Sequence, residues 1–154
     1  LGIHPPTSLD TWPNLTVGFF ASLVVFVAHR QMGKVRRGVL VLDAFGMGLF
    51  AATGATIALA AGGSALAGAL IGTTTAVAGG VIRDVLVNEV PLLLHRDLYA
   101  LPALLGASLV VLADALSFPE NLGLVLGTVL ATGLRLLALW RKWNLPLARH
   151  LPTP

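Results

Sequence analysis

Cysteine is missing from the 154 residues, and charged residues make up only 11% of the chain. Without cysteine, neither a disulfide framework nor a thiolate metal site is possible. The low charged fraction excludes an ordinary soluble domain, because such domains carry roughly 25% charged residues. Hydrophobic residues reach 56%. The composition therefore predicts an integral membrane protein, and the length predicts a single domain over residues 1–154.

Five apolar stretches are candidates for membrane spans. A bilayer core roughly 30 Å thick requires about 20 apolar residues in a helix. The candidate spans cover residues 15–28 (extending to Arg30), 39–61, 64–87, 98–116 and 122–140. Segments 31–38, 62–63, 88–97 and 117–121 are then predicted loops. The fold class that follows is all-α, with five transmembrane helices.

Basic residues are confined to one side of these spans. The opposite side carries Asp10, Asp114 and Glu120. The rule that basic loops face the cytoplasm predicts an outer N-terminus and a cytoplasmic C-terminus. Such a face suits anionic membrane lipid rather than nucleic acid. All ten basic residues belong to it: Arg30, Lys34, Arg36, Arg37, Arg83, Arg96, Arg135, Arg141, Lys142 and Arg149.

A weak internal repeat links two segments on opposite sides of the membrane. Residues 1–12 (LGIHPPTSLDTW) parallel residues 87–98 (VNEVPLLLHRDL), with Pro5 matching Pro91. Opposite placement of the two copies is typical of an inverted repeat. The chain then begins inside a repeat, and two further spans ending in an Arg–Asp pair are expected before Leu1.

Small residues recur every four positions in the third and fifth spans, which allows helix backbones to approach closely in lipid. The candidate packing residues are Gly68, Gly72, Ala76, Gly123 and Gly127.

The third span also contains a glycine pair preceded by three threonines. Adjacent glycines each weaken a helix by about 1 kcal/mol relative to alanine. Gly79 and Gly80 therefore predict a broken or bent helix with a polar lining. Thr73, Thr74 and Thr75 cover about 200° of a helix, so at least one should face protein or a pore. Alternatively, their hydroxyls bond the carbonyls of the preceding turn.

The second and third predicted spans contain three charged residues: Asp43, Arg83 and Asp84. Ionisable groups there usually pair with one another or line a pathway. In the functional interpretation, the two carboxylates attract a cation and Arg83 is a movable counter-charge that responds to voltage. In the alternative, Arg83 and Asp84 anchor the helix at the interface, and Asp43 is an N-cap or first-turn charge.

Enzyme classes find little support. An intramembrane aspartyl protease needs two carboxylates that share one proton, whereas Arg83 next to Asp84 favours ionisation. The histidines (His4, His29, His95 and His150) have no paired metal spacing. We therefore expect no catalytic residue, no metal site and no cofactor.

Three segments carry a resemblance to a known family: VLVLDAFGMGLFAATGATIAL, AGGVIRDVLVNEVPLLLHRDLYALPALLGA and LRLLALWRKWNLP. They resemble bacterial TRIC proteins, the trimeric intracellular cation channels, some of which carry the label of glycine transporters. The resemblance implies seven spans, in two inverted three-span repeats and a final helix. This chain is similar to the last five. Residues 1–30 would end the first repeat, 39–116 would form the second and 122–141 the final helix, so we expect an N-terminally truncated chain.

The same resemblance implies a homotrimer in a bacterial inner membrane, with a pore for K⁺ or Na⁺ in each protomer. Gly79 and Gly80 match the bend of the family's fifth helix, with Ala78 where a third glycine is usual. The pore and gating candidates are then Asp43, Thr73, Thr74, Thr75, Gly79, Gly80, Arg83 and Asp84. A small-solute transporter and a non-conducting structural membrane protein are the alternatives.

Overall fold

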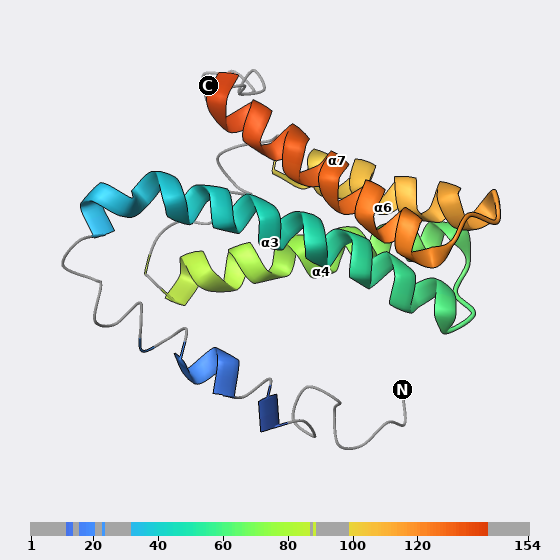
Figure 1. Cartoon of the computed structure of the whole chain (residues 1–154), viewed down its shortest axis with the longest axis horizontal. Helices are drawn as coiled ribbons and strands as arrows, with labels where there is room; N and C mark the ends of the chain where they lie inside the picture. The colour runs from blue at the N-terminus through green and yellow to red at the C-terminus, as the bar shows by residue number, and fades with distance from the viewer. Residues whose placement is uncertain are drawn as a thin grey trace, which may run out of the picture. The chain divides into compact units, whose positions relative to one another are not determined.

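Four long helices make up most of the computed structural model, which describes residues 12–13, 16–20, 23, 32–86, 88 and 99–141. They are α3 (Met32–Ala60), α4 (Ala65–Leu86), α6 (Ala100–Ala115) and α7 (Glu120–Arg141) (Figure 1). Contacts divide the chain into the units Leu1–Val39 and Leu40–Pro154. The helix packing described below is that of the second unit.

The structure has helices where the second to fifth membrane spans are predicted. Among the described residues, three segments are long and apolar enough to cross a membrane: Leu40–Ala60, Ala65–Leu86 and Glu120–Arg141. α6 is apolar but has 16 residues, fewer than the predicted span 98–116. Every regular element in the described ranges is helical, so the prediction of an all-α integral membrane fold is confirmed. The predicted first span lies outside the described residues except for 16–20 and 23, which are helical.

The predicted loop over residues 31–38 is wrong, because α3 already begins at Met32. Lysine and arginine are good helix formers, so a charged segment can continue a helix beyond its apolar part. The sequence prediction ended the helix where the apolar run ended. The two copies of the predicted repeat lie outside the described residues except for Trp12 and Asn88.

A tight turn joins α3 to α4. Gly62 has a φ of +80°, a conformation that costs glycine little because it has no Cβ. Its N–H donates to the carbonyl of Leu59, and that of Gly63 to the carbonyl of Ala58, both at 2.9 Å. This pair of bonds closes a helix C-terminus. The Ser64 hydroxyl then accepts a bond from the first turn of α4 at 3.3 Å, as an N-cap does.

The turn between α6 and α7 repeats this pattern with a serine. Ser117 has a φ of +58°, and the N–H groups of Ser117 and Phe118 donate to the carbonyls of Asp114 and Ala113, both at 2.9 Å. Pro119 follows and accepts the first bonds of α7. Short turns of this kind make the two helices of each pair antiparallel neighbours, as Figure 1 shows.

Alanine and glycine dominate the contacts between the helices. A Cβ placed on Gly72 of α4 would lie 2.5 Å from the Ala51 carbonyl oxygen of α3 and 2.9 Å from the Ala107 Cβ of α6. One on Gly106 of α6 would lie 2.6 Å from the Ala131 Cβ of α7. In a lipid bilayer the hydrophobic effect does not drive helices together, because the lipid tails are themselves apolar. Close backbone contact of this kind therefore contributes much of the attraction between membrane helices.

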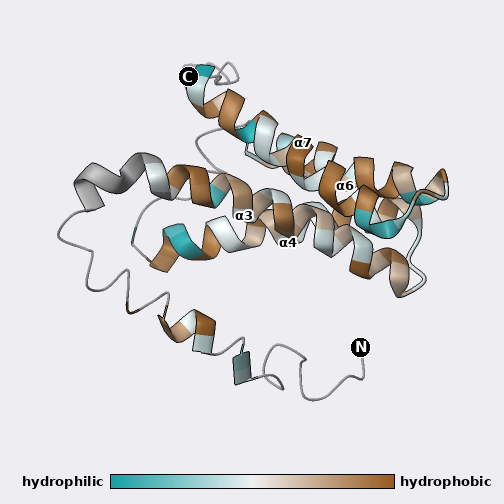
Figure 2. Cartoon of the chain, viewed as in Figure 1, coloured by the Kyte–Doolittle hydropathy of each residue, from teal (hydrophilic) through white to brown (hydrophobic). Residues whose placement is uncertain are grey.

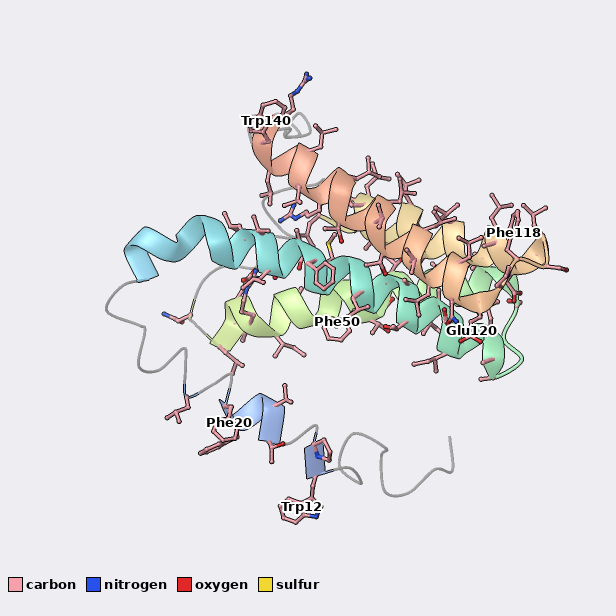
Figure 3. All side chains as sticks on the ribbon, viewed as in Figure 1. Trp12, Phe20, Phe50, Phe118, Glu120 and Trp140 are labelled. Atoms are coloured by element: carbon pink, nitrogen blue, oxygen red, sulfur yellow. The ribbon has the colours of Figure 1, made fainter. Side chains whose placement is uncertain are left out.

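Hydrophobic residues make up much of the four helices, and hydrophilic residues occur at a few positions, among them the end of α4 and the start of α7 (Figure 2). Many large apolar side chains are exposed, such as Phe50, Leu66 and Leu70. Phe118 and Glu120 lie at one end of α7 and Trp140 at the other (Figure 3). The end with Glu120 also contains Asp114 and the last turn of α3, which together line a cavity of about 190 Å³. Asp43, Arg83 and Arg135 belong to the opposite half of the bundle.

Candidate functional site

An ion-paired cluster joins α3 and α4 near the end of the bundle opposite Glu120. Arg83 Nε and Nη2 donate to Asp84 Oδ1 at 3.0 and 2.8 Å, and Arg83 Nη1 donates to Asp43 Oδ1 across the helix interface. Asp84 is 4% exposed, and the side chains of Arg83 and Asp43 are 33% and 15% exposed. One guanidinium thus pairs with two carboxylates in a half-buried setting, where removing the guanidinium would leave both carboxylates without this partner.

Tyr99 and Arg135 extend this cluster toward α6 and α7. Tyr99 directly precedes α6 and is the largest fully buried side chain among the described residues. Its ring lies against Gly80, whose Cβ, if present, would overlap the phenol oxygen and lie 2.7 Å from Cζ. The Arg135 guanidinium carbon stands 4.5 Å from the ring centroid. Side chains from all four helices or their ends therefore meet here.

A cavity of about 190 Å³ adjoins the cluster in the groove between α3 and α4. Asp43, Gly46 and Phe50 line it from α3, Gly79 and Gly80 from α4, with contributions from Met47, Ala76 and Tyr99. A Cβ on Gly46 or Gly79 would meet nothing within 4 Å among the described residues. The groove is thus open to one side, and Figure 3 shows Phe50 where α3 passes α4.

The threonines lie on α4 before Gly79, toward the middle of the helix. The hydroxyls of Thr73 and Thr75 donate to the carbonyls of Ala69 and Ile71, both at 2.7 Å, so the alternative of bonding to the preceding turn holds for these two. Thr74 and Thr75 are exposed and Thr73 is half-buried. Bonding within the helix leaves oxygen lone pairs available as acceptors.

The predicted break at Gly79–Gly80 is wrong. α4 is continuous from Ala65 to Leu86. Two glycines cost about 2 kcal/mol of helix propensity, which is less than the cost of leaving several backbone groups without hydrogen bonds at membrane depth. Gly80 is buried beneath Tyr99, while Gly79 faces the groove. A bend within the continuous helix stays a prediction.

The structure brings only some of the predicted residues together. Asp43, Arg83 and Asp84 form the cluster, Gly79 and Gly80 lie beside it, and the threonines are a further turn or two away along α4. The five candidate packing residues are all buried: Gly68, Gly72, Ala76, Gly123 and Gly127. The four histidines lie outside the described residues, and no group of three or more potential metal ligands occurs within those residues.

Tyr99 and Arg135 were not among the predicted site residues. Two signals in the sequence pointed to them. Tyr99 is the only tyrosine in the chain, and Arg135 follows Gly123, Gly127 and Ala131 at four-residue spacing. An arginine on the packing face of a membrane helix is expected to face the bundle interior, but its partner cannot be read from spacing.

The fold and the cluster together define a multi-span helical membrane protein with ion-paired side chains between its helices. Residues 40–115 match the family model described as Glycine transporter. The inner membrane protein YadS of Escherichia coli K12, a UPF0126 protein, is 33% identical over 138 residues, which are 87% of this chain and 65% of YadS. A UPF0126 membrane protein of Vibrio cholerae is 34% identical over 70% of this chain and 44% of its own length.

Solved structures extend the match to three dimensions. One from work on conductance through TRIC cation channels is 39% identical, with a TM-score of 0.87 over 97% of this chain and 74% of the other. The TRIC trimeric intracellular cation channel orthologue from Rhodobacter sphaeroides is 32% identical, with a TM-score of 0.84 over 92% and 73%. The chain belongs to the TRIC family. It spans less than two thirds of the length of the curated relatives above.

Proposed function

We propose that this chain forms one wall of a monovalent cation pore, with the groove between α3 and α4 facing the ion path. The observation that carries the proposal is the cluster of Asp43, Arg83 and Asp84 next to an open cavity in an apolar helix pair. Charged groups inside a membrane bundle are costly and typically mark an ion or substrate pathway. The 39% identity to a TRIC cation channel supports a channel and not an enzyme.

In this proposal the cluster is the cytoplasmic mouth of the pore. Asp43 and Asp84 favour cations there, and Arg83 narrows the path by occupying both carboxylates. Thr74 and Thr75, which are exposed residues, lie deeper, and their hydroxyl oxygens replace part of the ion's hydration shell. One elementary charge crossing 100 mV is worth about 2.3 kcal/mol, so movement of Arg83 through part of the field would make opening voltage-dependent.

The assembly is also part of the proposal. The chain forms a homotrimer in a bacterial inner membrane with its C-terminus in the cytoplasm, and each protomer carries its own pore. Residues 39–116 act as the second of two inverted repeats and 122–141 as the final helix. The TRIC trimeric channel from Rhodobacter sphaeroides, with its TM-score of 0.84, supports this arrangement.

Planar bilayer recording tests the function. Under a KCl gradient, current through the purified protein should reverse near the potassium equilibrium potential. Asp43→Asn should lower the unitary conductance for K⁺, because it removes a negative charge from the mouth. Asp114→Asn is the matched control, since Asp114 is exposed and lies at the opposite end of the bundle. Reversal at the chloride potential, or no current, would refute the cation channel.

A small-solute transporter is the second candidate, and the family model described as Glycine transporter favours it. Proteoliposomes with radiolabelled glycine separate the two. Saturable uptake without single-channel current steps would replace the channel with a transporter, whereas current steps without uptake would exclude the transporter.

A further inference from the structure

The contact between Tyr99 and Arg135 serves no role in the pore described above, yet both side chains are only 2% exposed. Arg135 lies six residues before the end of α7, and an arginine at such a position is expensive unless a partner compensates its charge. The aromatic face 4.5 Å away provides part of that compensation. Cation–π attraction is strongest where both groups are removed from water.

The phenol end of Tyr99 rests on α4. It occupies the space that a side chain at position 80 would fill. The ring therefore contacts both the backbone of α4 and the guanidinium of α7. If α4 moves away from α6 at Gly80, either Tyr99 moves with it or the contact between Tyr99 and Gly80 is lost.

The position of Gly80 connects that contact to the ion pairs. Asp84 lies one helical turn farther on the same face, and Arg83 lies three residues farther, so about 4.5 to 6 Å separates them along the axis. α4 is continuous over this segment. Displacement of Gly80 therefore displaces Arg83 and Asp84 relative to Asp43.

We propose that Tyr99 and Arg135 form a latch that holds the end of α4 in place against α6 and α7, keeping Arg83 paired with Asp43 across the mouth and favouring the closed pore. They are positioning residues, because they act through α4 and do not touch the ion. This inference rests on the proposed channel function. It predicts that weakening the stacked pair raises the open-to-closed ratio while the conductance of the open pore stays the same.

Single-channel recording of two substitutions tests the latch. Arg135→Gln removes the charge, and Tyr99→Leu removes the aromatic face while keeping an apolar side chain. Each should raise the open-to-closed ratio about tenfold, a change in line with loss of a desolvated cation–π contact. The double substitution should add little to either one, because both remove the same interaction. Tyr99→Phe keeps the ring and should stay close to the unsubstituted protein.

Arg141 provides a matched control. Its guanidinium carbon lies 5.8 Å from the ring centroid of Trp140, but both residues are exposed. Arg141→Gln therefore removes a cation–π contact on a neighbouring part of α7 without touching the latch. Its open-to-closed ratio should not change. Three results would overturn the proposal. Arg141→Gln could change the open-to-closed ratio as much as the latch substitutions do, the effects of the two latch substitutions could add, or the latch substitutions could leave the ratio unchanged.

A second measurement does not depend on conduction. Because the chain has no cysteine, Gly46→Cys places a single thiol in the groove cavity. Its reaction rate with a cationic methanethiosulfonate reagent reports access to the mouth. Arg135→Gln should accelerate this reaction about tenfold, and Arg141→Gln should not. An unchanged rate overturns the latch, whereas absence of current with an accelerated rate refutes the channel and retains the latch.

Discussion

Gly79 and Gly80 are adjacent on α4 but should respond to the same substitution in opposite ways. A methyl group on Gly79 would point into the open groove, whereas one on Gly80 would overlap the phenol end of Tyr99. Alanine is favoured over glycine in a helix interior by about 1 kcal/mol, and this gain applies at both positions. Only Gly80→Ala also forces a buried side chain to move.

The size of the difference follows from that displacement. Overpacking of a filled interior costs about 1 to 3 kcal/mol, and displacing Tyr99 from Arg135 adds about 2 kcal/mol for the desolvated cation–π contact. After the helix gain of about 1 kcal/mol is subtracted, we expect Gly80→Ala to lower the free energy of unfolding by about 2 to 4 kcal/mol. Gly79→Ala should raise it by up to about 1 kcal/mol.

Thermal unfolding in detergent measures both changes. For a chain of this size, 1 kcal/mol corresponds to about 2 to 4 °C in Tm. Gly80→Ala should therefore lower Tm by about 4 to 16 °C, and Gly79→Ala should raise it by up to about 4 °C. In a Tyr99→Leu background the ring atoms that obstruct the methyl group are absent, so Gly80→Ala should no longer destabilise.

Two results would refute the reasoning. Equal Tm shifts for the two alanine substitutions would mean that Gly80 is not packed beneath Tyr99. A destabilisation by Gly80→Ala that persists in the Tyr99→Leu background would assign the effect to another neighbour. Circular dichroism of each variant checks that helix content is unchanged, so that the comparison concerns packing and not loss of α4.

Three further predictions concern other contacts. Asp43→Asn should lower the free energy of unfolding by about 1 to 2 kcal/mol, a value between those for exposed and buried ion pairs. Thermal unfolding of this variant, with Asp114→Asn as the control, checks this. Gly72→Leu should reduce the yield of folded, monodisperse protein in size-exclusion chromatography, because even its Cβ would lie 2.5 Å from a carbonyl oxygen of α3; a normal elution profile would contradict the packing. Thr75→Val should lower unitary K⁺ conductance more than Thr73→Val, because Thr75 is exposed and Thr73 is half-buried; equal conductance in bilayer recordings would remove Thr75 from the ion path.

Much of the fold could be predicted because a membrane restricts the choices. Within the described residues, the apolar runs over 64–87 and 122–140 correspond closely to α4 and α7, and the run over 39–61 corresponds to α3 without its first two turns. The errors arose where local signals were too weak to decide. The charged residues after 31 did not prevent a helix, because lysine and arginine are good helix formers. The pair Gly79–Gly80 did not break α4, because backbone hydrogen bonds outweigh helix propensity in an apolar environment.

By itself, the sequence determined that this chain is a bundle of membrane helices with small residues on its packing faces and with Asp43, Arg83 and Asp84 inside its spans. Hydropathy and four-residue spacing are local properties, so they can be read along the chain. Only the tertiary structure decided which groups meet. It placed Arg83 between a carboxylate on its own helix and one on α3, and it set Arg135 over Tyr99. Such pairings depend on how the helices are rotated and offset against each other, which no periodicity in a single sequence specifies.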